Sequence, residues 1–106
     1  PLGIMQIESG ERYVGYAKKN TPEKIELYIM KPYNNKAASI GNGTMIAFLA
    51  ESKEIVNKFH AIGLENGALD EGVPGPRHGN DYYAYIRDLD GNKICAYTSS
   101  EIWKNI

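Results

Sequence analysis

The sequence predicts an α+β fold built from antiparallel strands and one helix. Three observations indicate this class. Apolar residues alternate with polar ones in the first third of the chain, as in KIELYIM (24–30). Apolar residues recur at helical spacing between residues 55 and 62, and a tight turn in RDLDGNKICAY (87–97) joins two strand-like runs.

Three strands are expected in the first part of the chain. Residues 3–10 (GIMQIESG) predict a strand that ends at Ser9-Gly10, and residues 12–18 predict a second. The third is expected at residues 24–30, after a turn that Pro22 favours. In this strand one face is apolar and the other carries the candidate site residues Glu26 and Tyr28. The three strands predict an antiparallel meander.

The second part predicts a strand, a helix and three further strands. A strand at residues 43–50 leads into a helix with Ser52 as N-cap and Glu54 in its first turn. The expected apolar stripe of the helix is Ile55, Val56, Phe59 and Ile62, and Asn66-Gly67 is expected to end it.

A long loop follows the helix, with a short strand expected near residues 68–72. The last two strands are expected at 82–88 and 92–98, with a reversal at Leu89-Asp90-Gly91-Asn92. In the first of them, Ala84 and Ile86 are expected to pack on the helix, while Tyr83, Tyr85 and Arg87 share the other side.

We interpret these elements as a single domain. It consists of a partial first module (1–33), a turn-rich linker (34–42), a second module (43–98) and a tail (99–106) that forms a short helix or lies against a partner.

The composition and charge of the chain make some classes of binding partner unexpected. The chain is 42% hydrophobic and 24% charged with a net charge of −1, so neither nucleic acid nor a membrane is expected as a partner. No apolar run approaches the roughly 20 residues of a membrane span, and no signal peptide is visible. The single cysteine fits a reducing, cytoplasmic setting.

Two segments carry a family resemblance. GNGTMIAFLAESKEIVNKFHAIGLENGALDEGVPGPR (41–77) and YYAYIRDLDGNKICAYT (82–98) resemble the second half of glyoxalase/bleomycin resistance/dioxygenase proteins, the vicinal oxygen chelate superfamily. The resemblance covers residues 1–98 and is most specific at 82–97. It implies paired βαβββ modules whose sheets curl around a shared groove. The first module then lacks its opening strand and helix.

The resemblance also implies positions for a metal. Metal-dependent members use a histidine on the first strand, a position that would precede Pro1 here. Their other ligands, a glutamate, a histidine and a glutamate, correspond to Glu26, Met45 and Cys95. The thioether of methionine is a very weak ligand for a hard divalent ion. One thiolate and one carboxylate supply only two of the four ligands that a tetrahedral zinc site needs. We therefore expect no cofactor, with Met45 and Cys95 as apolar groups that fill the groove. A divalent metal, or a soft ion such as copper(I), is the alternative.

The groove residues point to a small organic ligand. Tyr28, Tyr83, Tyr85 and Tyr97 would suit a flat or amphipathic molecule, and the alternative is that they are cross-strand packing pairs.

Charged groups would line the same groove. Glu26 either faces Tyr83, Tyr85 or Arg87 or is simply solvated. Arg77 and His78 could hold an anion from the long loop, or be solvated there. His60 is expected to be a partly exposed helix residue rather than a ligand.

The functional prediction is a glyoxalase-like small-molecule binding protein with a degenerate metal site. One alternative is a divergent metal-dependent lyase, isomerase or dioxygenase whose site is completed by residues absent from this chain. The other is a truncated relative with a role in assembly.

The apolar face of the third strand also predicts a covering element. Burying each of Ile25, Leu27 and Ile29 contributes about 1.5–3 kcal/mol to the free energy of folding. Leaving this face exposed to water would therefore remove a large fraction of the stability of a small domain. About 25 further N-terminal residues, or a homodimer to which Ile102 and Trp103 of the tail contribute, would cover it.

Overall fold

The structure is a computed structural model that describes residues 1–77 and 79–99. Its elements are β1 (Ile4–Ser9), β2 (Tyr13–Lys18), β3 (Leu27–Met30), β4 (Met45–Leu49), α1 (Lys53–Glu65), β5 (Leu69–Pro76), β6 (Tyr82–Arg87) and β7 (Lys93–Thr98). They form two compact units that divide between Ala38 and Ser39, with Leu2 belonging to the second. We call them the first unit and the second unit. The fold is α+β, as the sequence predicts.

The first unit is an antiparallel sheet of three strands in the order β1-β2-β3. The predicted meander is therefore confirmed, and residues 1–38 contain no helix. The third strand is shorter than the predicted span 24–30, because the chain is still turning at Lys24, whose amide donates to the carbonyl of Thr21 at 3.0 Å. The amide of Glu26 already donates to Tyr16 at 2.9 Å, so pairing with β2 starts just before β3.

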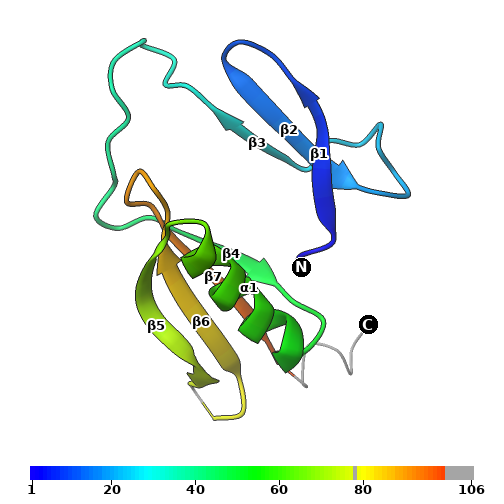
Figure 1. Ribbon diagram of the computed structural model, residues 1–106, viewed down its shortest axis with the longest axis vertical. Helices are drawn as coiled ribbons and strands as arrows, with labels where there is room; N and C mark the ends of the chain where they lie inside the picture. The colour runs from blue at the N-terminus through cyan, green and yellow to red at the C-terminus, as the bar shows by residue number, and fades with distance from the viewer. Residues whose placement is uncertain (78, 100–106) are drawn as a thin grey trace. The chain divides into compact units, whose positions relative to one another are not determined.

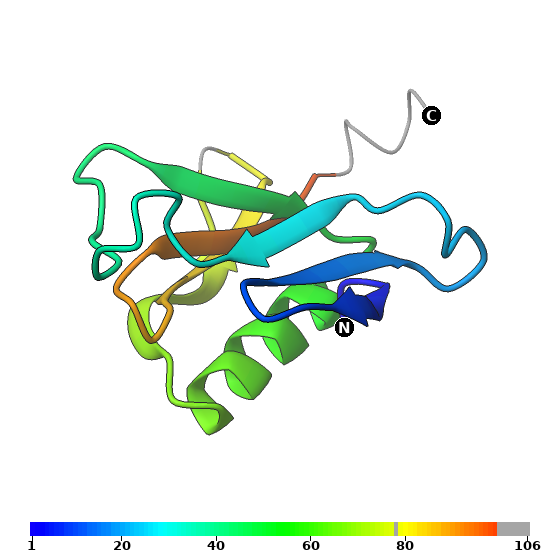
Figure 2. The same ribbon diagram turned by 90° about the horizontal axis from the view of Figure 1, so that it is seen from above.

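The second unit is a four-stranded sheet in the order β4-β7-β6-β5 (Figure 1). β4 runs parallel to β7, and α1 connects β4 to the three antiparallel strands that follow. Figure 2 shows that α1 lies on a single face of this sheet. The second unit is therefore one complete strand–helix–three-strand module. The first unit, an antiparallel meander of three strands, has the same topology as β5, β6 and β7 of the second unit.

Local signals set the ends of α1. The hydroxyl of Ser52 accepts from the amide of Ile55 at 3.2 Å, which confirms the predicted N-cap. Asn66 is the C-cap, and Gly67 follows it with φ of +99°, a conformation that glycine adopts without a Cβ clash.

The buried stripe of α1 differs from the predicted one. Val56 and Phe59 are buried at 0% and 6% exposed, but Ile62 is 40% exposed. The stripe continues instead through His60 to Gly63, where an added Cβ would lie 3.1 Å from Ile86. Because Gly63 has no side chain, hydrophobic spacing alone does not reveal it.

The core of the second unit lies between α1 and the sheet. The side chains that share it are small or apolar, and they are Ala50, Val56, Phe59, Ala84, Ile86 and Ala96. The predicted packing of Ala84 and Ile86 on the helix is therefore confirmed. Small side chains on the sheet let the helix approach closely, so packing here is sensitive to volume.

The reversal between β6 and β7 is the predicted hairpin. The amide of Asp88 donates to Asn92 at 3.0 Å, and that of Gly91 donates back to Asp88 at 2.9 Å. The Asp88 carboxylate also accepts from the amides of Asp90 and Asn92 at 3.0 and 2.8 Å. Gly91 has φ of +91°, so its lack of a side chain permits the turn.

β5 corrects the predicted short strand at 68–72. It extends to Pro76 and contains Pro74 as well. The prolines are tolerated because β5 is at the edge of the sheet and its pairing with β6 is interrupted twice, between Asp70 and Gly75.

None of the helices in the described part of the chain is both long enough and apolar enough to cross a membrane. The predicted tail helix, with Ile102 and Trp103, falls on residues 100–106, outside the described residues.

Candidate functional site

The face of the second unit's sheet that lies opposite α1 carries most of the predicted site residues. Side chains alternate along each strand, and Ala84, Ile86 and Ala96 point to the helix, so their neighbours point away from it. In β6 and β7 the neighbours are Tyr83, Tyr85, Arg87, Lys93, Cys95 and Tyr97; in β4 they are Met45, Ala47 and Leu49. We call this surface the tyrosine face.

Three tyrosines of this face form one stack. Tyr83 lies opposite Tyr97 across the β6–β7 ladder, with ring centroids 5.3 Å apart and planes at 14°. Tyr83 also stacks on Tyr85, two residues along β6, at 5.9 Å and 5°. The three rings are half-buried. They are cross-strand and same-strand packing pairs, and together they also present an ordered set of parallel aromatic rings.

The phenol of Tyr83 stays protonated at neutral pH. Burial raises its pKa, and the nearby carboxylate of Asp81 raises it further by disfavouring a second negative charge. A neutral phenol both donates and accepts hydrogen bonds.

Cationic groups surround Tyr85. The guanidinium carbon of Arg77 lies 5.5 Å from the ring centroid and Nζ of Lys93 lies 5.1 Å from it. Arg87, on the same side of β6, pairs with Glu71, whose Oε1 lies 3.1 Å from both Nε and Nη2. The charge of Arg87 is therefore met by a carboxylate, whereas Arg77 and Lys93 contact an aromatic ring.

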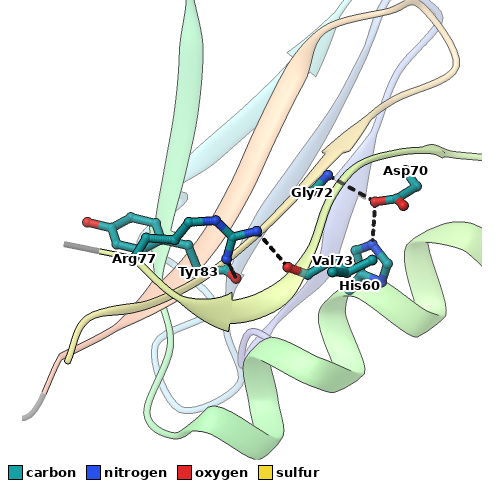
Figure 3. Close-up of polar contacts among 6 residues, drawn as sticks. All are labelled: His60, Asp70, Gly72, Val73, Arg77 and Tyr83. Atoms are coloured by element: carbon teal, nitrogen blue, oxygen red, sulfur yellow. Dashed lines mark hydrogen bonds and ion pairs between the residues drawn. The ribbon is translucent and has the colours of Figure 1, made fainter. Parts of the chain in front are cut away.

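Arg77 is held more firmly than a solvated loop residue would be. Its Nη2 donates to the carbonyl of Val73 at 2.8 Å, and its Nη1 donates to that of Tyr83 at 3.3 Å (Figure 3). Nη1 also donates to the carbonyl of Gly75 at 2.9 Å. Of these acceptors, Val73 lies where the β5–β6 register is interrupted, between Gly72 and Gly75. Arg77 is therefore not a freely moving loop residue, because its donors are largely used inside the loop. His78 lies outside the described residues.

The two sulfur residues differ in exposure. Met45 is 44% exposed, and its predicted role of filling a groove shared by both modules stays a prediction. Cys95 is 0% exposed. Burial raises the pKa of its thiol, and Lys93 opposes this shift.

These donors do not fit a family-type metal. A buried thiol with a raised pKa is a poor thiolate ligand, and a thioether does not bind hard ions. Among residues 1–77 and 79–99, no three histidine, cysteine, aspartate or glutamate side chains gather closely enough to hold a metal ion.

In the first unit, Tyr28 forms a small cluster that sequence analysis did not detect. Its hydroxyl lies 3.5 Å from Oε1 of Glu8, and its ring meets that of Tyr13 edge-on at 5.8 Å. The absence of a side chain at Gly15 allows the Glu8 and Tyr28 side chains to pack above it, since an added Cβ would lie 3.1 Å from Glu8 and 3.2 Å from Tyr28. Glu26 is exposed in this unit. Its predicted approach to Tyr83, Tyr85 or Arg87 would join the two units and stays a prediction.

His60 is buried rather than partly exposed, at 7%. Its Nε2 donates to Oδ1 of Asp70 at 3.0 Å, and the same oxygen accepts from the amide of Gly72 at 2.9 Å (Figure 3). These bonds, that from His60 first, lower the pKa of Asp70. The pair joins α1 to β5 on the helix side of the sheet and so supports the fold rather than the tyrosine face.

Three polar partners, Lys93, Asp70 and Glu71, are absent from the predicted set. Lys93 could have been found, because it alternates with Cys95 and Tyr97 along β7. Asp70 and Glu71 could not, since their partners His60 and Arg87 lie in other elements and no sequence spacing relates them.

Comparison with known proteins identifies the family. No protein-family model matches the sequence, and no curated protein matches it. Among solved structures, a glyoxalase/bleomycin resistance protein from Albidiferax ferrireducens T118 is 38% identical, with a TM-score of 0.80, over 92% of this chain and 78% of that one.

Two less similar structures share the fold. A glyoxalase-related enzyme from Fulvimarina pelagi has a TM-score of 0.70 at 12% identity, over 92% of this chain and 71% of that one. A lactoylglutathione lyase from Agrobacterium tumefaciens has a TM-score of 0.62 at 17% identity, over 95% and 78%. The identity and coverage of the Albidiferax protein decide the assignment: the chain belongs to the glyoxalase/bleomycin resistance protein family.

Proposed function

We propose that this protein binds a small, flat or amphipathic organic molecule on the tyrosine face, without a catalytic metal. The observation that carries the proposal is the parallel stack of Tyr83, Tyr85 and Tyr97 on the sheet face opposite α1. An aromatic contact adds about 0.5–1.5 kcal/mol beyond the area that it buries, so an ordered stack favours a planar ligand. The phenol hydroxyls supply orientation.

The chemistry of the family's metal positions supports a metal-free site. Met45 and Cys95 replace a histidine and a glutamate of the resemblance, and neither suits a hard divalent ion. The similar Albidiferax protein is described as a glyoxalase/bleomycin resistance protein. The family resemblance implies that some members sequester drugs. The same class of role is proposed for this chain.

A thermal-shift screen of planar organic compounds against chelator-treated protein tests the proposal. A ligand at about 100 times its Kd should add about 2.7 kcal/mol to the free energy of unfolding. The variant Y97L should lose the shift because it removes one ring of the stack. The matched control is Y33L, since Tyr33 is 99% exposed and its loss should leave the shift intact.

Two results would contradict the proposal. One is a shift that Y97L leaves unchanged, because the ligand would then bind elsewhere. The other is stoichiometric nickel, zinc, iron or manganese in the purified protein, which would instead favour a divergent lyase, isomerase or dioxygenase.

We also propose a homodimer in a reducing, cytoplasmic compartment. The apolar face of β3 supports the dimer, because Ile29 on this face is 58% exposed. The single buried thiol of Cys95 supports a reducing setting. Light scattering at micromolar concentration should give twice the chain mass, and I29K should give a monomer. A wild-type monomer would contradict the dimer.

A further inference from the structure

The tyrosine face carries positive charge that no carboxylate of the described residues pairs. The ion pairs found in residues 1–77 and 79–99 are His60–Asp70 and Arg87–Glu71. Arg77 donates to neutral carbonyl oxygens, and Lys93 lies over a ring. Asp81 is an acidic group near the stack, and its charge acts on Tyr83. The cations gather instead at Tyr85.

The two cations differ in freedom. Arg77 is fixed by its three carbonyl acceptors, so it supplies a charge that does not move. Lys93 carries a compact ammonium on a flexible stem, and this ammonium lies 5.1 Å from the centroid of the half-buried Tyr85 ring. A ligand carboxylate would attract this ammonium more strongly than the ring does, because a charge-assisted hydrogen bond replaces a cation–π contact.

We infer that the tyrosine face takes a planar aromatic anion, such as an aromatic carboxylate, whose ring extends the tyrosine stack and whose charge is met by Lys93 and Arg77. This inference rests on the proposed function and names the ligand class for it. The aromatic rings and the unpaired cations are adjacent at Tyr85, and that adjacency selects an anion over a neutral or cationic ring.

Calorimetric titration with three probes of equal shape tests the ligand class. The probes are 2-naphthoate, 2-naphthylmethanol and (2-naphthylmethyl)ammonium. The anion should bind about tenfold more tightly than the alcohol, which corresponds to about 1.4 kcal/mol, and the ammonium should bind most weakly, because only the anion gains a charge-assisted hydrogen bond. The preference should fall at high salt.

Lysine variants test the residue. K93M keeps most of the unbranched stem and removes the ammonium, so it should weaken naphthoate binding about tenfold while leaving binding of the alcohol unchanged. K93R keeps the charge and should restore most of the affinity. The matched control is K53M, because Lys53 also lies over a tyrosine, 5.5 Å from the ring of Tyr82, but on the helix side of the sheet. K53M should bind naphthoate like the wild type.

The outcomes separate the inference from the proposed function. Equal or tighter binding of the alcohol or the ammonium overturns the ligand class and leaves a small-molecule site in place. Equal losses in K93M and K53M overturn the role of Lys93. Binding of none of the three probes overturns the inference, and the thermal-shift screen then decides the proposed function by itself.

Discussion

Gly72 controls the position of Tyr85, and its substitution by alanine should disturb the tyrosine face. A Cβ added at Gly72 would lie 2.7 Å from Cδ2 and 3.4 Å from Cβ of Tyr85. Those atoms are near the root of the side chain, so the ring must rotate away from Tyr83 or β5 must move. Overpacking of this kind costs about 1–3 kcal/mol, and the lost stacking adds about 0.5–1.5 kcal/mol.

An opposing effect reduces the net cost. Alanine restricts the unfolded chain more than glycine does, which stabilises a compatible site by about 0.4–1 kcal/mol. G72A should therefore be destabilised by about 1–3 kcal/mol in total. The matched control is G75A on the same strand, where the added Cβ would first meet Nη1 of Arg77 at 3.4 Å, an ordinary contact. G75A should be as stable as the wild type or slightly more stable.

Urea denaturation gives both stabilities, and near-UV circular dichroism reports the tyrosine stack. The near-UV signal should change in G72A and not in G75A. Wild-type stability with an unchanged spectrum in G72A would refute the close approach of β5 to Tyr85. Equal destabilisation of the two variants would show that alanine is harmful anywhere on β5.

Three further predictions concern the second unit. V56A should lose about 2–3 kcal/mol of unfolding free energy and I62A less than about 1 kcal/mol, because Val56 is fully buried and Ile62 is 40% exposed; equal losses in urea denaturation would contradict the observed stripe of α1. The lowered pKa of Asp70 contributes stability that is present above the usual aspartate pKa of about 4 and is lost as the pH falls through the folded value; wild-type thermal stability should therefore fall in acid more steeply than that of D70N, and identical pH profiles would disprove it. Because burial shields the thiol of Cys95 and raises its pKa, a thiol reagent should modify it far more slowly in native protein than in urea; immediate native labelling would contradict its burial.

Much of the fold could be predicted because its signals are local. Ser52 caps α1 through a neighbouring amide, and Gly67 and Gly91 adopt positive φ at the predicted stops. Alternation along β6 assigned Ala84 and Ile86 to the helix side, since a strand places successive side chains on opposite faces. Each of these inferences needs only residues close together in the sequence.

The errors have non-local causes. β5 accommodates Pro74 and Pro76 because it is an edge strand with interrupted pairing, and its place in the sheet cannot be read from its own sequence. His60 is buried because Asp70 accepts its hydrogen bond from another element. Gly63, rather than Ile62, faces the sheet, since an added Cβ there would lie 3.1 Å from Ile86, and hydrophobic spacing does not detect a residue without a side chain.

The candidate site was predicted in part for the same reason. Alternation placed Tyr83, Tyr85 and Arg87 on one side, and the register with β7 brings Tyr97 and Cys95 opposite them. Arg77 donates to the carbonyl of Val73, where the β5–β6 register is irregular, and no sequence pattern indicates that irregularity. The sequence therefore identified the aromatic rings but not the groups that fix the charge around them.

A titration of 2-naphthoate into chelator-treated protein with isotope-labelled tyrosine rings, followed by NMR, tests the central claim most directly. The account predicts that the ring resonances of Tyr83, Tyr85 and Tyr97 shift together in a saturable way, while those of the exposed Tyr33 stay in place. Ring resonances of the stack that do not respond, or that respond only after a divalent metal is added, would contradict it.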